Sequence, residues 1–356
     1  MNIPIAPIQS ALMLAVLLAV PATAQVSGSA VDNAFLERAD ATKYVVIMAG
    51  PTVGQDNEDM FRQWAFSLHD ILARDYGYSS DSIILLHANG DRDFSGGERI
   101  DGAADRSGIE QALSALRTRV STGDQITLYL IGHGSGADDE AKFNIVGPDI
   151  TGSEFAAMLD QFEQQDIVII NTTSASYGFS ASLSSEGRVV ISSTRSAQER
   201  YDPIFSRYFI EALDGRNGDR DKNNRVSMLE AFNYAKANVE AWYEEQGRLA
   251  SEHAGLDDNG DALFSLNPTT EEADGRLAEI AYIDTLVSND EQLSPQARQL
   301  KGRMQELERA VFILRGRKGD YLEQDYWAQL QELLVDLART TGQFYEISDT
   351  DAASTN

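Results

Sequence analysis

Two hydroxyl-bearing residues, Thr173 and Ser174, follow an apolar run at the point where a buried strand would end. The run reads Asp-Ile-Val-Ile-Ile-Asn from Asp166 to Asn171. His133 stands in a Gly-His-Gly sequence directly after another apolar run, from Gln125 to Ile131. A hydroxyl beside a histidine can carry out nucleophilic acyl transfer, with the histidine as general base. The residue types therefore predict a candidate catalytic pair of His133 with Thr173, or with Ser174 if the register slips by one.

A second group of oxygen-bearing side chains lies between Asp219 and Glu230. Side-chain oxygens stand at positions one, three, five, nine and twelve, and the residue at seven would offer its backbone carbonyl, which is the ligand pattern of an EF-hand calcium loop. The residues in this pattern are Asp219, Asp221, Asn223, Arg225, Ser227 and Glu230. Ca²⁺ is the expected cofactor. A metal-free interpretation fits as well, a turn in which Ser227 caps the following helix and Glu230 completes a capping box.

The elements that would position these residues alternate between strand and helix patterns. They lie, in order, at 43–50, 57–76, 82–87, 107–120, 125–131, 152–162, 166–171, 188–193 and 203–213, with a final edge strand at 264–266. Such alternation predicts βαβ units and a mostly parallel sheet with helices on both faces, an α/β fold of the three-layer α/β/α sandwich type. Ligands bind beyond the carboxyl ends of parallel strands, so His133 and the Thr173–Ser174 turn should meet at one edge.

The order of these motifs resembles that of the caspase/legumain-like cysteine peptidases (clan CD type). The strand ending in His133-Gly134, the strand ending at the Thr173 turn and the Val-Val-Ile-Ser-Ser-Thr strand with its following helix carry the resemblance over 43–266. The resemblance implies a caspase-like sheet, with His133 on the family's catalytic histidine. Thr173 falls on the position of the family's cysteine, with Ser174 as the second choice, and the chain contains no cysteine. Family members carry similar acidic turns, so a vestigial calcium loop is a third interpretation of 219–230.

The missing cysteine separates two functional hypotheses. A cysteine thiol ionises at about pH 8.5, whereas a threonine or serine hydroxyl attacks only when an aligned base, itself oriented by a third group, removes its proton. We therefore expect a pseudopeptidase, proteolytically inactive, that acts as a peptide- or protein-binding scaffold. The alternative is an active peptidase or other hydrolase in which Thr173 or Ser174 attacks and His133 is the base.

The apolar spacing changes after Pro268 to alternating steps of three and four residues. This pattern over 300–314 and 327–344 predicts two antiparallel helices, a coiled-coil-like hairpin that could support oligomerisation, with a shorter helix before it at 275–287. The expected division of the chain is a signal peptide at 1–24, a linker at 25–41, the caspase/legumain-like domain at 42–267, the helical module at 272–346 and a disordered tail at 347–356.

The N-terminal residues and the net charge indicate an exported protein. A short apolar run, Ala11 to Val20, precedes the small-residue sequence Ala22-Thr-Ala24, which is typical of a secretory signal peptide and its cleavage site. We expect a periplasmic or extracellular protein with no membrane insertion after cleavage. The formal net charge of -27 argues against nucleic-acid binding, which needs clustered basic residues. A peptide or protein partner is expected instead.

Overall fold

The computed structural model describes residues 33–38, 41–52, 55–271, 273–284 and 293–355. Its centre is a six-stranded sheet in the order β2-β1-β3-β7-β8-β9, with a small antiparallel sheet of β4, β5 and β6 beside it. In the large sheet all neighbours are parallel except β9, which is antiparallel to β8. The strands are β1 (Lys43–Ala49), β2 (Ile83–His87), β3 (Gln125–Ile131), β4 (Gly134–Ser135), β5 (Lys142–Phe143), β6 (Ile150–Thr151), β7 (Asp166–Asn171), β8 (Arg188–Ser192) and β9 (Gly255–Asp257).

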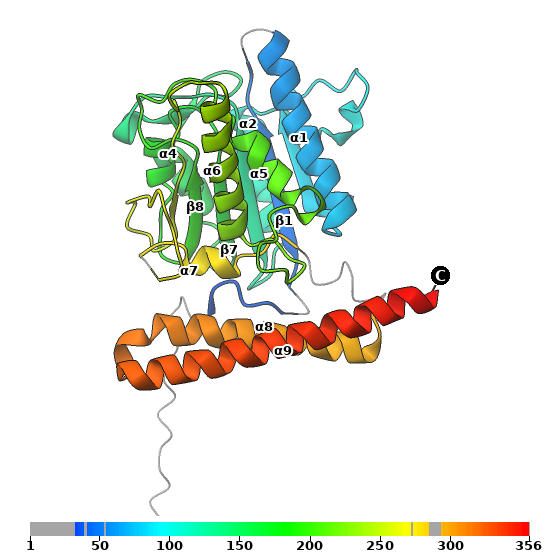
Figure 1. Cartoon of the computed structure of the whole chain (residues 1–356). Helices are drawn as coiled ribbons and strands as arrows, with labels where there is room; N and C mark the ends of the chain where they lie inside the picture. Colours follow the sequence, from blue (N-terminus) through cyan, green and yellow to red (C-terminus); the bar gives the residue numbers. More distant parts are fainter. Residues whose placement is uncertain (1–32, 39–40, 53–54, 272, 285–292, 356) are drawn as a thin grey trace, which may run out of the picture.

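Helices cover both faces of the large sheet, so the expected α/β/α sandwich is confirmed (Figure 1). Helices α1, α5 and α6 pack on one face, and α2, α3 and α4 pack on the other. The helices are α1 (Gln55–Asp75), α2 (Arg106–Arg117), α3 (Gly152–Leu159), α4 (Tyr177–Ala181), α5 (Phe205–Leu213), α6 (Met228–Glu245), α7 (Arg276–Ile280), α8 (Pro295–Gly316) and α9 (Glu323–Thr355).

The inner strands are mostly apolar, because both faces of the sheet are covered. In β1, Val45 and Ile47 join the core under α1 and α5, while Val46 and Met48 join the core under α2 and α3. Successive residues of a strand point to opposite faces, so a strand covered on both sides needs an uninterrupted apolar run. This requirement explains why the sequence marks the inner strands so clearly.

Two expected elements differ in the structure. The edge strand is β9, not 264–266, because Leu256 pairs with Ile191 of β8, whereas Ser265 forms only an isolated bridge to the outer side of Leu256. The helix expected at 275–287 ends at Ile280, and the chain beyond it leaves helical geometry so that Asp284 can pair with a buried arginine. Residues 285–292 and the expected signal peptide lie outside the described residues.

The C-terminal helices α8 and α9 form a hairpin that lies beneath the sheet domain (Figure 1). Helix α8 is attached to the domain by Phe312, whose fully buried ring belongs to the core under α5 and α6. Arg315 adds hydrogen bonds of 2.7 and 2.8 Å to Glu279. Helix α9 continues to Thr355, so it includes most of the stretch at 347–356 that is expected to be a disordered tail. Among the described helices, none combines the length and apolar character needed to span a membrane.

Candidate functional site

The carboxyl edge of the sheet brings His133 next to Asp202. His133 follows β3 through Gly132, whose φ of 145° favours glycine. Its Nδ1 lies 2.9 Å from Oδ1 of Asp202, in the loop between β8 and α5. The other carboxylate oxygen of Asp202 accepts a 2.8 Å hydrogen bond from Nδ2 of Asn57 on α1. The imidazole is therefore oriented by a carboxylate that α1 holds in place, and Nε2 is left as the ring atom for a ligand.

Thr173 and Ser174 reach the same edge, but their hydroxyls are buried and engaged elsewhere. Oγ1 of Thr173 donates to Oδ1 of Asn171 at 2.7 Å, and the residue is 1% exposed. Oγ of Ser174 accepts a 3.3 Å hydrogen bond from the backbone N–H of Gly134, and Ser174 is 2% exposed. Within the described chain, no hydrogen bond joins either hydroxyl to the ring of His133. The predicted pair is thus close along the sheet edge without forming a nucleophile–base contact.

The turn that carries these residues is held by a cluster of small hydroxyl side chains. Oγ of Ser176 lies 2.9 Å from the hydroxyl of Ser192 and 2.9 Å from that of Thr194, both at the end of β8. Ser193 Oγ donates to the carbonyl of Thr173 at 2.8 Å. These buried hydroxyls satisfy one another and the backbone, as buried polar groups must. The hydroxyl-rich composition of the turn therefore has a packing role.

A second histidine–carboxylate pair anchors the loop that carries Asp202. Nδ1 of His253 lies 2.6 Å from Oε1 of Glu199, and Oε2 of Glu199 accepts from the backbone N–H of Arg195 at 3.0 Å. The carbonyl of Glu199 accepts a 2.8 Å bond from the N–H of Ala175 in the hydroxyl turn. The loop that carries Asp202 is thus bonded both to the residues just before β9 and to the turn at 172–176 after β7.

A cavity of about 230 Å³ opens beside this site, at the ends of β1 and β2. It shares Phe61 with the histidine, since the rings of Phe61 and His133 are 5.4 Å apart. Burial lowers the pKa of His87, which also lines the cavity, so this imidazole is uncharged at neutral pH. The residues around the cavity are Gly50, Pro51, Thr52, Glu58, Phe61, His87, Ala88, Asn89 and Val146.

The acidic loop between α5 and α6 gathers three of its six expected metal ligands. One carboxylate oxygen from each of Asp219, Asp221 and Glu230 lies within 4.8 Å of the others. Burial raises the pKa of Asp221 to about 6, and the negative charges of Glu230 and Asp219 add to this effect. The capping box is also formed, because Oε2 of Glu230 accepts from the N–H of Ser227 at 2.9 Å and the N–H of Glu230 donates to Oγ of Ser227 at 3.3 Å. The loop therefore contains the features of both interpretations.

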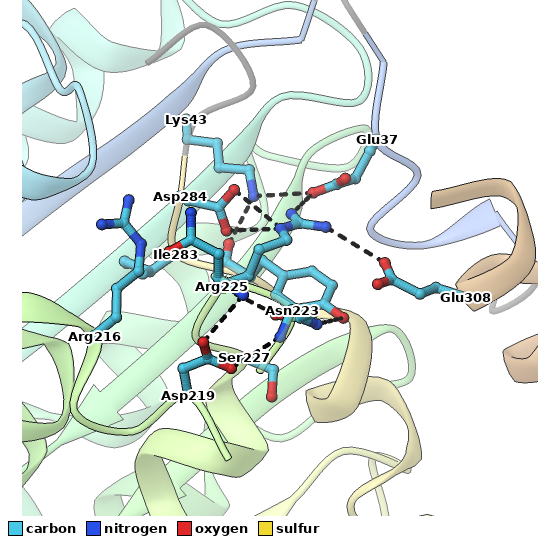
Figure 2. A network of polar contacts seen from close by, with 12 residues as sticks. Glu37, Lys43, Arg216, Asp219, Asn223, Arg225, Ser227, Ile283, Asp284 and Glu308 are labelled. Carbon is cyan, nitrogen blue, oxygen red and sulfur yellow. Dashed lines mark hydrogen bonds and ion pairs between the residues drawn. The ribbon is translucent and has the colours of Figure 1, made fainter. Parts of the chain in front are cut away.

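The other expected ligands are used differently. The backbone N–H of Asn223 donates to Asp219 and Asp221 at 3.1 and 2.9 Å, which folds the loop around its own carboxylates. The side chain of Arg225 leaves the loop and enters a buried ion-pair network (Figure 2). Only the backbone carbonyl of Arg225 was expected to bind metal, so the two roles are compatible.

Arg225 connects the sheet domain to the hairpin. Its guanidinium is hydrogen-bonded to Asp284 at 3.0 and 3.1 Å, is paired with Glu37, and lies 3.6 Å from Glu308 of α8. The guanidinium also stacks 3.5 Å from the centre of the Tyr282 ring. With the side chain 7% exposed, this arginine joins the N-terminal segment, the chain after α7 and the hairpin at one buried point (Figure 2).

The sequence interpretation missed Asp202 and Asn57. Asp202 follows the fifth predicted strand, at the carboxyl edge of the sheet, and an acidic residue at that position was the available signal. Asn57 was assigned to a helix, and nothing in the sequence showed that this helix starts next to His133. No model of a known protein family and no curated protein matches this chain.

Proposed function

We propose that this chain is a caspase/legumain-like pseudopeptidase that binds a peptide or protein segment at the carboxyl edge of its sheet and does not cleave it. The supporting observation is the contrast between the two halves of the predicted pair. His133 is oriented by Asp202, and its side chain is 26% exposed. Thr173 is buried, and its hydroxyl proton is directed to Asn171.

The chemistry of acyl transfer explains why this contrast favours binding. A hydroxyl attacks a carbonyl only if its proton passes to a base during the attack and the carbonyl carbon can approach the oxygen. The acceptor of the Thr173 proton is an amide oxygen, which is not a useful base, and burial keeps a substrate carbonyl away. The imidazole of His133, in contrast, can exchange a hydrogen bond with a ligand without any covalent step.

The test is peptide binding, measured by fluorescence anisotropy with a labelled random octapeptide library. We expect His133→Ala to weaken binding at least about tenfold, since the oriented ring loses a hydrogen bond to the ligand. His69→Ala is the matched control, because His69 lies on α1 beside Asp70 and does not line the site. Equal binding by His133→Ala and the wild type would remove the proposed site.

A hydrolase is the second candidate, and the His133–Asp202 pair is the observation that favours it. A carboxylate on Nδ1 is the third group that orients a histidine base towards a hydroxyl nucleophile. The deciding measurement is labelling by a fluorophosphonate probe, with the adduct mapped by mass spectrometry. An adduct on Thr173 or Ser174 that is lost in His133→Ala would establish the hydrolase and exclude the pseudopeptidase.

Calcium is our proposal for the loop at 219–230. The supporting observations are the three converging carboxylates and the raised pKa of Asp221, because a divalent cation would offset the repulsion between these groups. Its role would be structural, since Arg225 in the same loop holds the hairpin.

Export and assembly complete the proposal. The signal-like N-terminal sequence supports a periplasmic or extracellular location, and N-terminal sequencing of the protein recovered from the cell exterior tests it.

Helix α9 supports assembly with a second copy, since Trp327, Leu334 and Val335 are 46%, 40% and 47% exposed on it. A molar mass from light scattering that falls in Leu334→Glu would support this oligomer.

A further inference from the structure

We infer that the ligand places a basic side chain, lysine or arginine, in the cavity beside His133, with its cation at the carboxylate of Glu58. The inference rests on the proposed binding function and adds the chemical class of the ligand. The partner would therefore be a peptide or protein segment that carries a lysine or arginine where it passes His133.

The cavity offers both the apolar surface and the polar groups that such a side chain uses. Pro51, Phe61, Ala88 and Val146 contribute apolar side chains to its lining, and Thr52, Glu58, His87 and Asn89 contribute polar ones. Lysine and arginine bury their stems against apolar surface and keep the charged group at a polar end. The volume, about 230 Å³, lies below the range of roughly 300–1,000 Å³ that holds a drug-sized molecule, so the cavity suits a single side chain.

The lining of the cavity carries one negative formal charge, on Glu58, and the cation of Arg62 lies beside it. Glu58 is the one formally charged side chain among the described residues that line it, and His87 is neutral there because burial lowers its pKa. The whole chain adds a net charge of -27, which attracts cationic ligands over longer distances. An acidic side chain in the same cavity would meet Glu58 without a compensating cation.

The carboxylate of Glu58 is available to a ligand. Its nearest cation is Arg62, with 3.9 Å between Nη1 of Arg62 and Oε1 of Glu58, which is too long for a hydrogen bond. Arg62 has a closer partner in Asp59. The Glu58 side chain is 47% exposed, so solvent reduces the strength of a new ion pair without blocking access to it.

The cavity and the histidine are placed to act on one extended ligand. Phe61 lines the cavity, and its ring centre lies 5.4 Å from that of His133. A peptide crossing the carboxyl edge of the sheet can thus put one side chain beside Glu58 while its main chain passes His133. The same segment is then recognised by an ion pair at Glu58 and by a hydrogen bond at His133.

The experiment uses the full-length protein and fluorescein-labelled octapeptides randomised at every position except the fourth. That position carries arginine, its neutral isostere citrulline, or glutamate. We expect the wild type to bind the arginine library about fivefold more tightly than the citrulline library, the range for a partly exposed charge-assisted hydrogen bond. Glu58→Gln should remove this difference. Glu98→Gln, which changes an exposed glutamate outside the cavity, should keep it.

The outcomes separate this inference from the binding function. Equal binding of arginine and citrulline libraries, or a difference that persists in Glu58→Gln, overturns the basic ligand. If His133→Ala still weakens all three libraries in that case, the binding function stands. If the wild type binds none of the libraries, the binding function is overturned and the basic ligand with it. A melting curve for each variant shows that the comparison is made between folded proteins.

Discussion

The imidazole of His133 and the carboxylate of Asp202 form a pair with 2.9 Å between Nδ1 and Oδ1, although they follow different strands of the sheet, β3 and β8. Asn57 fixes the far oxygen of the same carboxylate at 2.8 Å. This pair gives the histidine a fixed orientation at the carboxyl edge of a parallel sheet. The hydroxyl that would complete a catalytic site is turned towards Asn171 instead.

Replacing Asp202 with asparagine tests whether this orientation matters. An amide nitrogen or oxygen can still reach Nδ1, but it no longer selects the tautomer that leaves Nε2 as acceptor. We expect octapeptide binding to fall about as far as in His133→Ala, roughly tenfold. Ring ¹⁵N chemical shifts of His133 should show a mixed tautomer in Asp202→Asn. Unchanged binding together with a changed tautomer would mean that the pair has no role in recognition.

Thr173→Val removes the hydroxyl and keeps the side-chain shape. Oδ1 of Asn171 loses one of its two donors, since the N–H of Thr173 remains 3.1 Å away. We expect the free energy of unfolding to fall by about 1 kcal/mol and peptide binding to stay unchanged. Urea denaturation measures the first and anisotropy the second. Ser185→Ala, at an exposed serine after α4, is the control for stability.

Glu252 predicts a pH dependence of stability. Burial raises the pKa of Glu252 to about 7 in the folded protein, from 4.5 when exposed, against the opposing effect of hydrogen bonds from Ile204 and Phe205. Between these two pH values the folded protein keeps a proton that the unfolded chain has released, so stability falls as the pH rises through the window. The difference between the two pKa values corresponds to about 3 kcal/mol at most.

The variant Glu252→Gln should not show this fall. Its amide oxygen can accept only one of the two backbone hydrogen bonds that the carboxylate accepts from Ile204 and Phe205, which lowers its stability equally at every pH, but the amide has no proton to lose. We expect its advantage in free energy of unfolding over the wild type to grow by about 2–3 kcal/mol between pH 5 and pH 8, measured by urea denaturation. Glu240→Gln, at a side chain that is 62% exposed, is the control, and its free energy of unfolding should change with pH as that of the wild type does.

Calcium should stabilise the folded protein if the loop at 219–230 binds it. A site with a dissociation constant a hundred times below the calcium concentration adds about 2.7 kcal/mol, or several degrees in Tm. We expect a rise in Tm from chelator to 1 mM Ca²⁺ of about 5 °C, with none in Asp221→Asn. Asp261→Asn, at an exposed aspartate after β9, is the control and should respond like the wild type. An unchanged Tm in the wild type leaves the capping box as the role of Glu230.

Arg225→Met tests the buried ion-pair network in Figure 2. Methionine fills much of the space but leaves Asp284 and Glu37 buried without their cation, which costs about 3–5 kcal/mol of stability. Because Glu308 of α8 loses the same partner, proteolysis between the sheet domain and the hairpin should also become faster. Arg339→Met, which breaks an exposed pair on α9, should change stability by less than about 0.5 kcal/mol.

The sequence was sufficient for the inner strands and most of the helices around them. Short, mostly apolar runs such as Gln125–Ile131 are typical of a strand buried on both faces, and β3 has these bounds in the structure. A local signal also fixed a helix start, since Ser227 forms with Glu230 the capping box that their spacing predicts. The sequence placed the edge strand wrongly, at 264–266. The observed strand β9 is only three residues long, and its pairing depends on which segment reaches β8.

The side-chain partners were decided by the tertiary structure. Residue type and position along the chain were enough to place His133, Thr173 and Ser174 at one edge of a parallel sheet, because the carboxyl ends of such strands meet there. They could not tell that His133 pairs with Asp202, or that the Thr173 hydroxyl donates to Asn171, because a hydrogen bond depends on positions within a few tenths of an ångström. The sequence determined that no cysteine can act as a nucleophile in this chain. Only the fold decided that the hydroxyl of Thr173 is buried and that the ring of His133 is partly exposed.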